Sequence, residues 1–203
     1  MPRARQFDRD RALDDAVEVF WSQGYDATSV QDLVHAMGVN RGSLYDTFGR
    51  KHDLFLAALA RYDETVCESA LTELDEPGRA MEKVRLFFDG VIRAGLDDAE
   101  RRGCLFVNSA TEVAAHDPAA RDLINGHVRR VEQAFAKILG EGIAAGELDP
   151  DLDVEAFAGF LIGTLIGIRT LSRTDPRPEK LNAIAQVAIS ALADRVIQPV
   201  GAD

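Results

Sequence analysis

Cysteine is scarce in this chain of 203 residues, which contains only Cys67 and Cys104. Two cysteines do not make a disulfide framework, and their separation rules out a Cys-x-x-Cys motif. No pair among the cysteines and the four histidines has the close spacing typical of a zinc site. We therefore expect free thiols, and neither a metal ion nor another cofactor.

Other signals are missing as well. No segment alternates polar and apolar residues for long enough to predict a strand. No nucleophile elbow, P-loop or metal signature is present, so the sequence argues against an enzyme. The N-terminus has no apolar run of the signal-peptide type. The longest apolar run, residues 156–168, falls short of the roughly 18 residues that suggest a membrane span. These absences predict a soluble, cytoplasmic protein without a membrane partner.

What remains is helical. Hydrophobic residues make up 46% of the chain, which is enough to bury a core. Apolar residues recur with a period near 3.6 in one segment after another, beginning with residues 9–23 and ending with residues 178–196. Gly and Pro separate these segments, as at Pro77 and Gly78. The pattern predicts an all-α protein of about nine helices.

Charge is distributed unevenly between two parts of the chain. The net charge is −11, which argues against a general nucleic-acid coat protein. Residues 1–51 carry seven Lys or Arg against eight Asp or Glu, whereas residues 52–203 carry sixteen against twenty-six. Five cations of the first part lie near the N-terminal tail or near predicted helix starts, namely Arg3, Arg5, Arg41, Arg50 and Lys51. A small basic footprint on an acidic body favours specific DNA binding.

Residues 28–51 have the order of a helix-turn-helix. Thr28 precedes an apolar stripe and has Gln31 three residues on, which predicts a capping box. Gly38 then breaks the pattern, and Asn40 is a good N-cap for a short third helix. In a helix-turn-helix the first helix braces a second one that enters the DNA major groove.

Residues 9–54 resemble the DNA-binding head of the TetR family of bacterial transcriptional regulators. The resemblance is carried by Phe20 in a helix that ends at Gly24-Tyr25, by Ala36-x-Gly38-Val39 in the turn, and by the run GVNRGSLYDTFGRKHDLF. It implies an N-terminal helix-turn-helix domain, residues 1–51, and a helical ligand-binding and dimerisation domain, residues 52–203. It also implies a transcriptional regulator, most often a repressor, that binds palindromic double-stranded operator DNA as a homodimer.

Each candidate DNA contact also has its own physical reading. Thr28 and Ser29 start a helix and would hold a phosphate or simply cap the helix. Arg41 would bond a guanine edge or grip a phosphate. Tyr45 would donate to a phosphate or pack as an ordinary aromatic. The full set of predicted contacts is Thr28, Ser29, Arg41, Gly42, Ser43, Tyr45, Thr47 and Lys51, the last as a phosphate anchor like the family's lysine at this place.

The chain departs from the family's common pattern at Asp46 and Thr47, where many relatives carry aromatic or imidazole side chains. An acidic residue on a recognition helix would accept a hydrogen bond from cytosine, or point to solvent or a basic neighbour. Thr47 would touch a thymine methyl. The operator sequence therefore cannot be copied from relatives.

The two C-terminal helices are the predicted dimer interface. A regular apolar stripe runs from Leu181 to Val196, and Gly159, Gly163 and Gly167 recur every four residues on one helix face. Such a row lets another helix approach closely. The alternative is packing within one subunit. The resemblance favours the dimer, because two C-terminal helices from each subunit form the interface in this family.

The middle helices would form a pocket for a small, largely apolar effector. Ordinary core is the alternative role for each aromatic. The candidate apolar walls are Phe87, Phe88, Val91, Phe106, Val131, Phe135, Phe157 and Phe160, and the candidate polar contacts are Asn108, Thr111, Glu112, His127 and Arg169.

Two further readings stay open. Cys104 follows Arg101 and Arg102 near a predicted helix start, and both features lower a thiol pKa. It would then be a redox or electrophile sensor that regulates transcription, although a small buried hydrophobe has the same pattern. The other alternative is a protein-interaction adaptor that no longer binds DNA.

Overall fold

The computed structural model describes residues 7–197 and is built from α-helices. Within these residues the only β-pairing is an isolated antiparallel bridge between Leu148 and Val196, which agrees with the all-α prediction. A π-helical segment joins α4 to α5 without a break, so the ten α-helices form nine continuous helical stretches. The helices are α1 (Arg9–Gln23), α2 (Val30–Ala36), α3 (Arg41–Phe48), α4 (Lys51–Tyr62), α5 (Glu68–Asp75), α6 (Ala80–Asp97), α7 (Leu105–Glu112), α8 (Pro118–Ala144), α9 (Val154–Thr174) and α10 (Pro178–Ala193), with the π-helical segment at Asp63–Cys67.

Contacts between residues divide the chain into two compact units. We call residues 1–67 and 104–125 the head unit, and residues 68–103 and 126–203 the body unit. The head unit therefore includes α7 and the first turns of α8 as well as α1 to α4. The boundary predicted between residues 51 and 52 follows the way TetR-type chains are divided into a DNA-binding and a ligand-binding domain, not the contacts between residues. That boundary stays a prediction.

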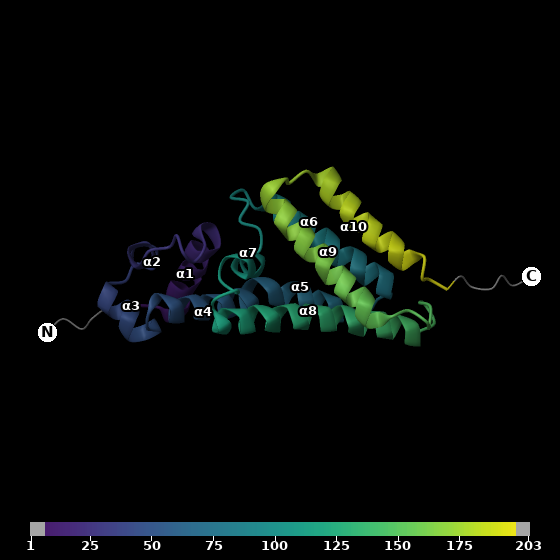
Figure 1. Ribbon diagram of the computed structural model, residues 1–203, viewed down its shortest axis with the longest axis horizontal. Coiled ribbons are helices and arrows are strands. Elements are labelled where there is room, and N and C mark those ends of the chain that lie inside the picture. Colours follow the sequence, from purple (N-terminus) through teal and green to yellow (C-terminus); the bar gives the residue numbers. More distant parts are fainter. Residues whose placement is uncertain (1–6, 198–203) are drawn as a thin grey trace, which may run out of the picture. The chain divides into compact units, whose positions relative to one another are not determined.

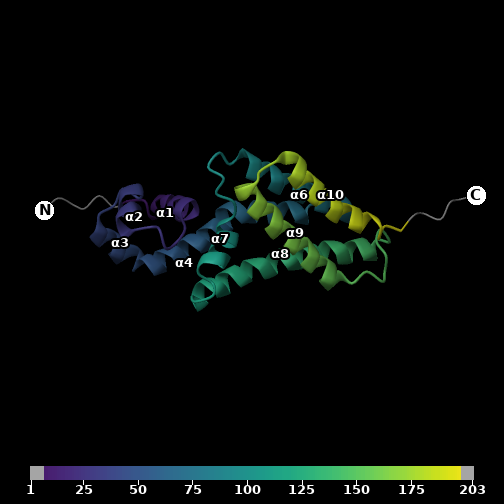
Figure 2. The same ribbon diagram turned by 45° about the horizontal axis from the view of Figure 1, so that its top comes forward.

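The head unit has a core of its own, built mainly from α1 and α4. Phe20 of α1 is fully buried, and its ring meets Phe55 of α4 edge-on with 5.2 Å between the centroids. Leu33 of α2 and Leu44 of α3 reach the same core and are also fully buried. Short helices such as α2 and α3 are unstable alone, so this packing holds them in place. Their arrangement next to α1 can be followed in Figure 2.

Local caps set where α2 and α3 begin. The capping box of α2 is formed by Ser29 and Asp32: the Ser29 side chain accepts from the Asp32 N–H, and the Asp32 carboxylate accepts from the Ser29 N–H. The prediction of Thr28 and Gln31 for this box was wrong by one residue, because the Thr28 side chain is buried and its hydroxyl donates to the carbonyl of Gly24. Asn40 caps α3 by accepting from the Ser43 N–H, as predicted.

The body unit packs α6, α9 and α10 against one another, as Figure 1 shows. Its core is a second apolar cluster centred on fully buried residues such as Phe88, Phe135, Leu161 and Leu181. Ion pairs join three of its helices. Lys137 of α8 lies 2.6 Å from Asp75 of α5 and 4.0 Å from Glu141, which in turn lies 3.6 Å from Lys83 of α6.

Helix α9 is unusual because it is strongly apolar yet only partly buried. By length and composition alone it could cross a membrane, and only 22% of its most apolar window is buried. The sequence pattern predicted no membrane span because only the uninterrupted apolar run was counted. The result for α9 differs because the whole helix is considered. Phe160 and Ile166 on this helix are exposed, as is Val187 on α10. Exposed apolar surface of this kind is typical of sites that bind another protein or a ligand.

Candidate nucleic-acid interface

The surface of α3 presents the polar residues that the sequence singled out. Leu44 and Phe48 point into the head core, which fixes the rotation of this short helix. The rest of the helix surface then leaves Arg41, Gly42 and Tyr45 exposed, together with Asp46 and Thr47, whereas Ser43 is half-buried. Five of the predicted contacts thus share one helix. At about 100° per residue, Arg41, Gly42 and Tyr45 lie on one face, which a major groove can accept, and Thr47 lies on the other side of the helix.

Arg41 and Tyr45 form a pair on this face. The Arg41 guanidinium donates from Nε and Nη2 to the Tyr45 hydroxyl at 3.3 and 3.2 Å, and it lies 5.6 Å from the centre of the Tyr45 ring. A phenol that accepts in this way still has its own O–H to donate. The pair therefore offers a guanidinium for a base edge or phosphate and a hydroxyl for a phosphate.

Lys51 begins α4 close to this helix in sequence. Its ammonium lies 4.3 Å from the centre of the Tyr25 ring, a cation–π contact that holds the side chain while leaving it half-buried. Burial raises the pKa of the Tyr25 hydroxyl, and the negative charges of Asp117, Asp26 and Asp53 raise it further. The Tyr25 ring is therefore neutral at physiological pH and keeps its electron-rich face for the lysine.

Thr28 and Ser29 differ in what they present to solvent. Thr28 is 1% exposed and its hydroxyl is used within the head, whereas Ser29 is exposed beside its cap partner Asp32. The hydrogen bond from Ser29 is the main cause that lowers the pKa of Asp32, which keeps this carboxylate charged. Two further predicted cations, Arg3 and Arg5, lie outside the described residues.

Two carboxylates of the segment 112–117 attach to the helix-turn-helix part of the head unit. Glu112 accepts from the backbone N–H groups of Tyr25 and Asp26 at 2.9 and 2.8 Å. Asp117 accepts from His52 Nε2 at 2.8 Å. The sequence pattern predicted an effector contact for Glu112 and no role for Asp117 or His52, because contacts between residues 65 to 87 positions apart leave no local signal.

The predicted pocket residues fall in both units. Phe106, Asn108, Thr111 and Glu112 belong to the head unit, and the other nine belong to the body unit. Several are tightly packed: the Phe87 ring lies edge-on to Phe135 at 5.1 Å and to Phe88 at 5.8 Å. Phe160, by contrast, is 44% exposed. Arg169 donates to the carbonyl of Gly103 at 2.9 Å. Their role toward an effector stays a prediction.

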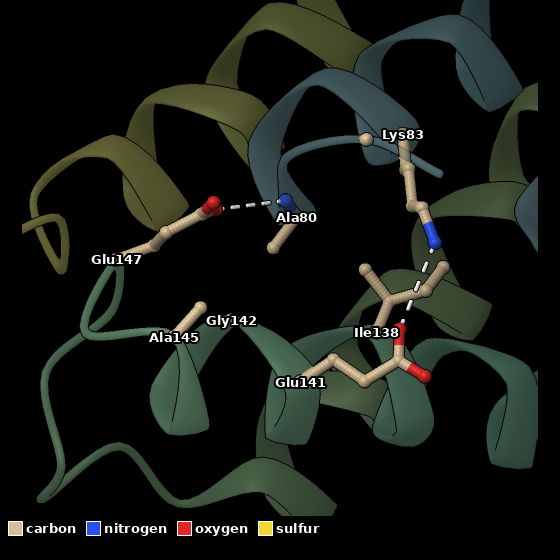
Figure 3. Close-up of a pocket in the computed structure, with 8 residues that line it drawn as sticks. Ala80, Lys83, Ile138, Glu141, Gly142, Ala145 and Glu147 are labelled. Carbon is tan, nitrogen blue, oxygen red and sulfur yellow. Dashed lines mark hydrogen bonds and ion pairs between the residues drawn. The ribbon is translucent and has the colours of Figure 1, made fainter. Parts of the chain in front are cut away.

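One small pocket of about 130 Å³ lies elsewhere in the body unit (Figure 3). Across it, Lys83 pairs with Glu141 at 3.6 Å, and the Ala80 N–H donates to Glu147 at 3.0 Å. None of the predicted pocket residues lines it. Small-molecule sites usually enclose roughly 300–1,000 Å³, so this space does not suit an effector of ordinary size.

Cys104 is buried and serves as the residue before α7, where it packs in the head core. Its neighbour Arg102 is paired with Asp98 at 3.1 Å. This environment is that of a small hydrophobe, and the sensor role predicted as an alternative for Cys104 stays a prediction.

Comparison with protein families supports the helix-turn-helix interpretation. Residues 12–58 match the model described as "Bacterial regulatory proteins, tetR family", and residues 80–188 match "Tetracyclin repressor-like, C-terminal domain". The second match alone covers more than half of the chain. Together the two matches cover the helix-turn-helix and most of the body unit.

Individual relatives and solved structures point to the same family. The HTH-type transcriptional regulator YezE of Bacillus subtilis is 33% identical over 95% of this chain and 100% of its own length. The HTH-type transcriptional repressor ComR of Escherichia coli is 30% identical over 90% and 88%. Among solved structures, a cysteine mutant of the TetR family regulator CifR, complexed with 26-bp double-strand operator DNA, has a TM-score of 0.85 and 33% identity and covers 93% of this chain and 99% of its own. The chain therefore belongs to the TetR family of bacterial transcriptional regulators, and it is a DNA-binding regulator of transcription.

Proposed function

We propose that this regulator is a cytoplasmic, homodimeric repressor that binds a palindromic operator and leaves it when a small, largely apolar effector binds. The observation that carries the DNA part is the exposed face of α3, where Arg41 and Tyr45 lie together while Leu44 and Phe48 anchor the helix in the core. The repressor assignment is supported by the relative ComR, whose name describes a transcriptional repressor.

The proposed contacts divide into two kinds. Arg41, Gly42, Ser43 and Thr47 of α3 would face base edges in the major groove, where a guanidinium reads guanine bidentately. Tyr45, Lys51, Ser29 and Thr28 would lie along the phosphates, which position the protein without reading sequence. Thr28 would contribute through its backbone, because its hydroxyl already donates to Gly24.

The uncovered apolar surface of α9 supports dimerisation through the two C-terminal helices. Gly163 is exposed, and a Cβ placed on it or on Gly167 would meet nothing within 4 Å. Phe160 and Ile166 on α9 and Val187 on α10 are also exposed, and this apolar surface suits a second copy of the same helices better than water. Two heads held in one dimer would read two half-sites one helical turn, or about 34 Å, apart.

The proposed effector enters the body unit near the aromatic residues Phe87, Phe88 and Phe135. These rings fill the interior in the structure, so an effector would have to separate them and stabilise a different packing. Binding shifts the protein away from DNA only if the effector binds that packing more tightly than the one described here.

The test is a binding measurement on a palindrome selected from random DNA with the wild-type protein. Fluorescence anisotropy would compare the full palindrome, a single half-site and a scrambled duplex at several salt concentrations. We expect the palindrome to bind at least about 10²-fold more tightly than the half-site, since linked sites gain an avidity of this order. Equal affinity for palindrome and half-site would contradict the dimer, and equal affinity for the scrambled duplex would contradict specific recognition.

A further inference from the structure

We propose that Glu112 is a positioning residue for operator binding. Its carboxylate at the end of α7 fixes the turn between α1 and α2, and with it the start of the helix-turn-helix. The sequence pattern predicted that Glu112 contacts the effector, whereas this proposal gives Glu112 a contact with the DNA-binding part of the head. It rests on the proposed phosphate contacts of Ser29 and Lys51, and the experiment below tests the Lys51 contact separately.

Two backbone N–H groups form an anion site around Glu112, and the Glu112 carboxylate is the anion that occupies it. Oε2 accepts from the Tyr25 N–H at 2.9 Å and Oε1 accepts from the Asp26 N–H at 2.8 Å, so both carboxylate oxygens are engaged. Hydrogen bonds from neutral donors to a charged acceptor are stronger than neutral pairs. Both bonds join residues 86 or 87 positions apart, so they fix the tertiary position of the turn.

Gly24 provides independent support for this contact. It has a φ of +84°, and a Cβ at this position would lie 2.8 Å from Glu112 Oε2 and 3.0 Å from Oε1. A side chain would therefore be strained by its backbone and would also collide with the carboxylate. The end of α1 is shaped to receive Glu112, and the Thr28 hydroxyl bonds the carbonyl of the same glycine at 2.6 Å. The chain leads from this turn into Ser29, the N-cap of α2.

A second carboxylate attaches the other end of the DNA-binding surface. Asp117 accepts from His52, which follows Lys51 at the start of α4, and it also accepts from the Ala120 N–H at 3.1 Å. The pKa of Asp117 is lowered: burial opposes this shift, but the hydrogen bonds from Ala120 and His52 outweigh it. Asp117 therefore remains a carboxylate under ordinary conditions.

The two attachments act on the two ends of one surface. Glu112 holds the segment that leads into Ser29, and Asp117 holds the residue next to Lys51, so the recognition helix α3 lies between two fixed points in the sequence. Both carboxylates belong to the short segment 112–117, and α8 begins at the next residue, Pro118, and continues to Ala144. A change in α7 or α8 that withdrew Glu112 would release the turn before α2.

The experiment compares Glu112→Gln, His52→Ala and Lys51→Ala with the wild-type dimer, using the selected palindrome. Asp122→Asn is the matched control, because it removes one negative charge from an exposed position on α8 near the same corner. For each protein we would measure the fraction active by stoichiometric titration, the dissociation constant, and its dependence on salt. We expect Glu112→Gln to bind about tenfold more weakly, as loss of one charge-assisted hydrogen bond allows. We expect Asp122→Asn to match the wild type.

The salt dependence separates positioning from mere loss of folded protein. Each phosphate contact contributes about 0.9 to the slope of log affinity against log salt. Misplaced contacts in Glu112→Gln lower this slope, and His52→Ala lowers it at the Lys51 end, whereas partial unfolding lowers the active fraction and leaves the slope unchanged. A wild-type slope in both variants, with or without a change in affinity, overturns the proposal. Lys51→Ala tests the proposed contact itself: an unchanged slope there refutes the phosphate contact and leaves the attachment of the turn to be judged by the affinity of Glu112→Gln.

Discussion

The head and body units differ in whether one chain completes them. In the head, α2 and α3 are short, yet each sends one or two residues into a fully buried core, and its exposed side chains are polar. In the body, the core is also dense, but α9 still exposes apolar side chains such as Phe160 and Ile166. The head thus presents a polar surface on α3, whereas the body presents exposed apolar side chains on α9. The two proposed partners would account for this difference, because DNA meets charges and hydrogen bonds, whereas a second subunit meets apolar area.

The largest change in assembly should come from placing a charge on the exposed apolar surface of the body. Gly163→Arg adds a cation where a Cβ meets no other atom within 4 Å, so the monomer should fold normally. We expect the dimer to be lost and affinity for the palindrome to fall about 10²-fold or more. Light scattering after gel filtration gives the mass. The control is Gly140→Arg on α8, also exposed and also without a neighbour at Cβ. If both variants remain dimers, the exposed apolar surface of α9 is not the dimer interface, and the proposed contrast between head and body is wrong.

The next effect is on the free energy of unfolding. It distinguishes a core phenylalanine from a surface phenylalanine among the residues predicted to line the pocket. Phe135 is fully buried, and its ring contacts Phe87, so Phe135→Ala should lower the free energy of unfolding by about 3–5 kcal/mol. Phe160 is 44% exposed, so Phe160→Ala should cost much less. Urea unfolding in the Gly163→Arg background, where association does not contribute, gives both values. Similar costs at the two positions would show that Phe160 is part of the core of one chain.

A smaller effect is expected on the head. Arg41→Ala removes the guanidinium that Tyr45 holds on the exposed face of α3, with little change in the core. We expect a loss of about 1–3 kcal/mol in binding to the selected palindrome and weaker discrimination against single base changes. Lys51→Ala should instead weaken binding to all duplexes alike. Binding to a panel of single-substitution operators distinguishes the two, and identical profiles would place Arg41 on a phosphate.

The smallest effect concerns a surface ion pair in the body. Asp175 accepts from Arg177 Nε and Nη2 at 2.8 Å each and from Lys180 at 3.0 Å, and these bonds, Arg177 first, hold its pKa well below the usual range. A depressed pKa gives stability that is present above the ordinary value near 4 and is lost as the pH falls through the folded value. The difference in unfolding free energy between wild type and Asp175→Asn should therefore be small at pH 7 and shrink below about pH 4. Urea unfolding of both proteins over this pH range gives the difference, and a difference that grows on acidification would contradict this pairing.

Local patterns in the sequence predicted the head more completely than the body. Asn40 was identified as a cap because caps depend on residues only three or four positions apart. The capping box of α2 was misplaced by one residue because Thr28 and Ser29 are chemically alike, and only the tertiary contact of Thr28 with Gly24 tells them apart. In the body, an aromatic on an apolar stripe looks the same whether it fills a core, like Phe135, or stays exposed, like Phe160.

The sequence by itself determined the all-α class, the helix-turn-helix and its polar surface on α3, since all of these follow from short-range spacing. Only the tertiary structure decided that Glu112 serves the turn before α2, that His52 is paired with Asp117, and that α9 remains uncovered in one chain. The physical reason is distance along the chain. A hydrogen bond between residues 87 positions apart, or an apolar face left without a partner, exists only once the helices have packed.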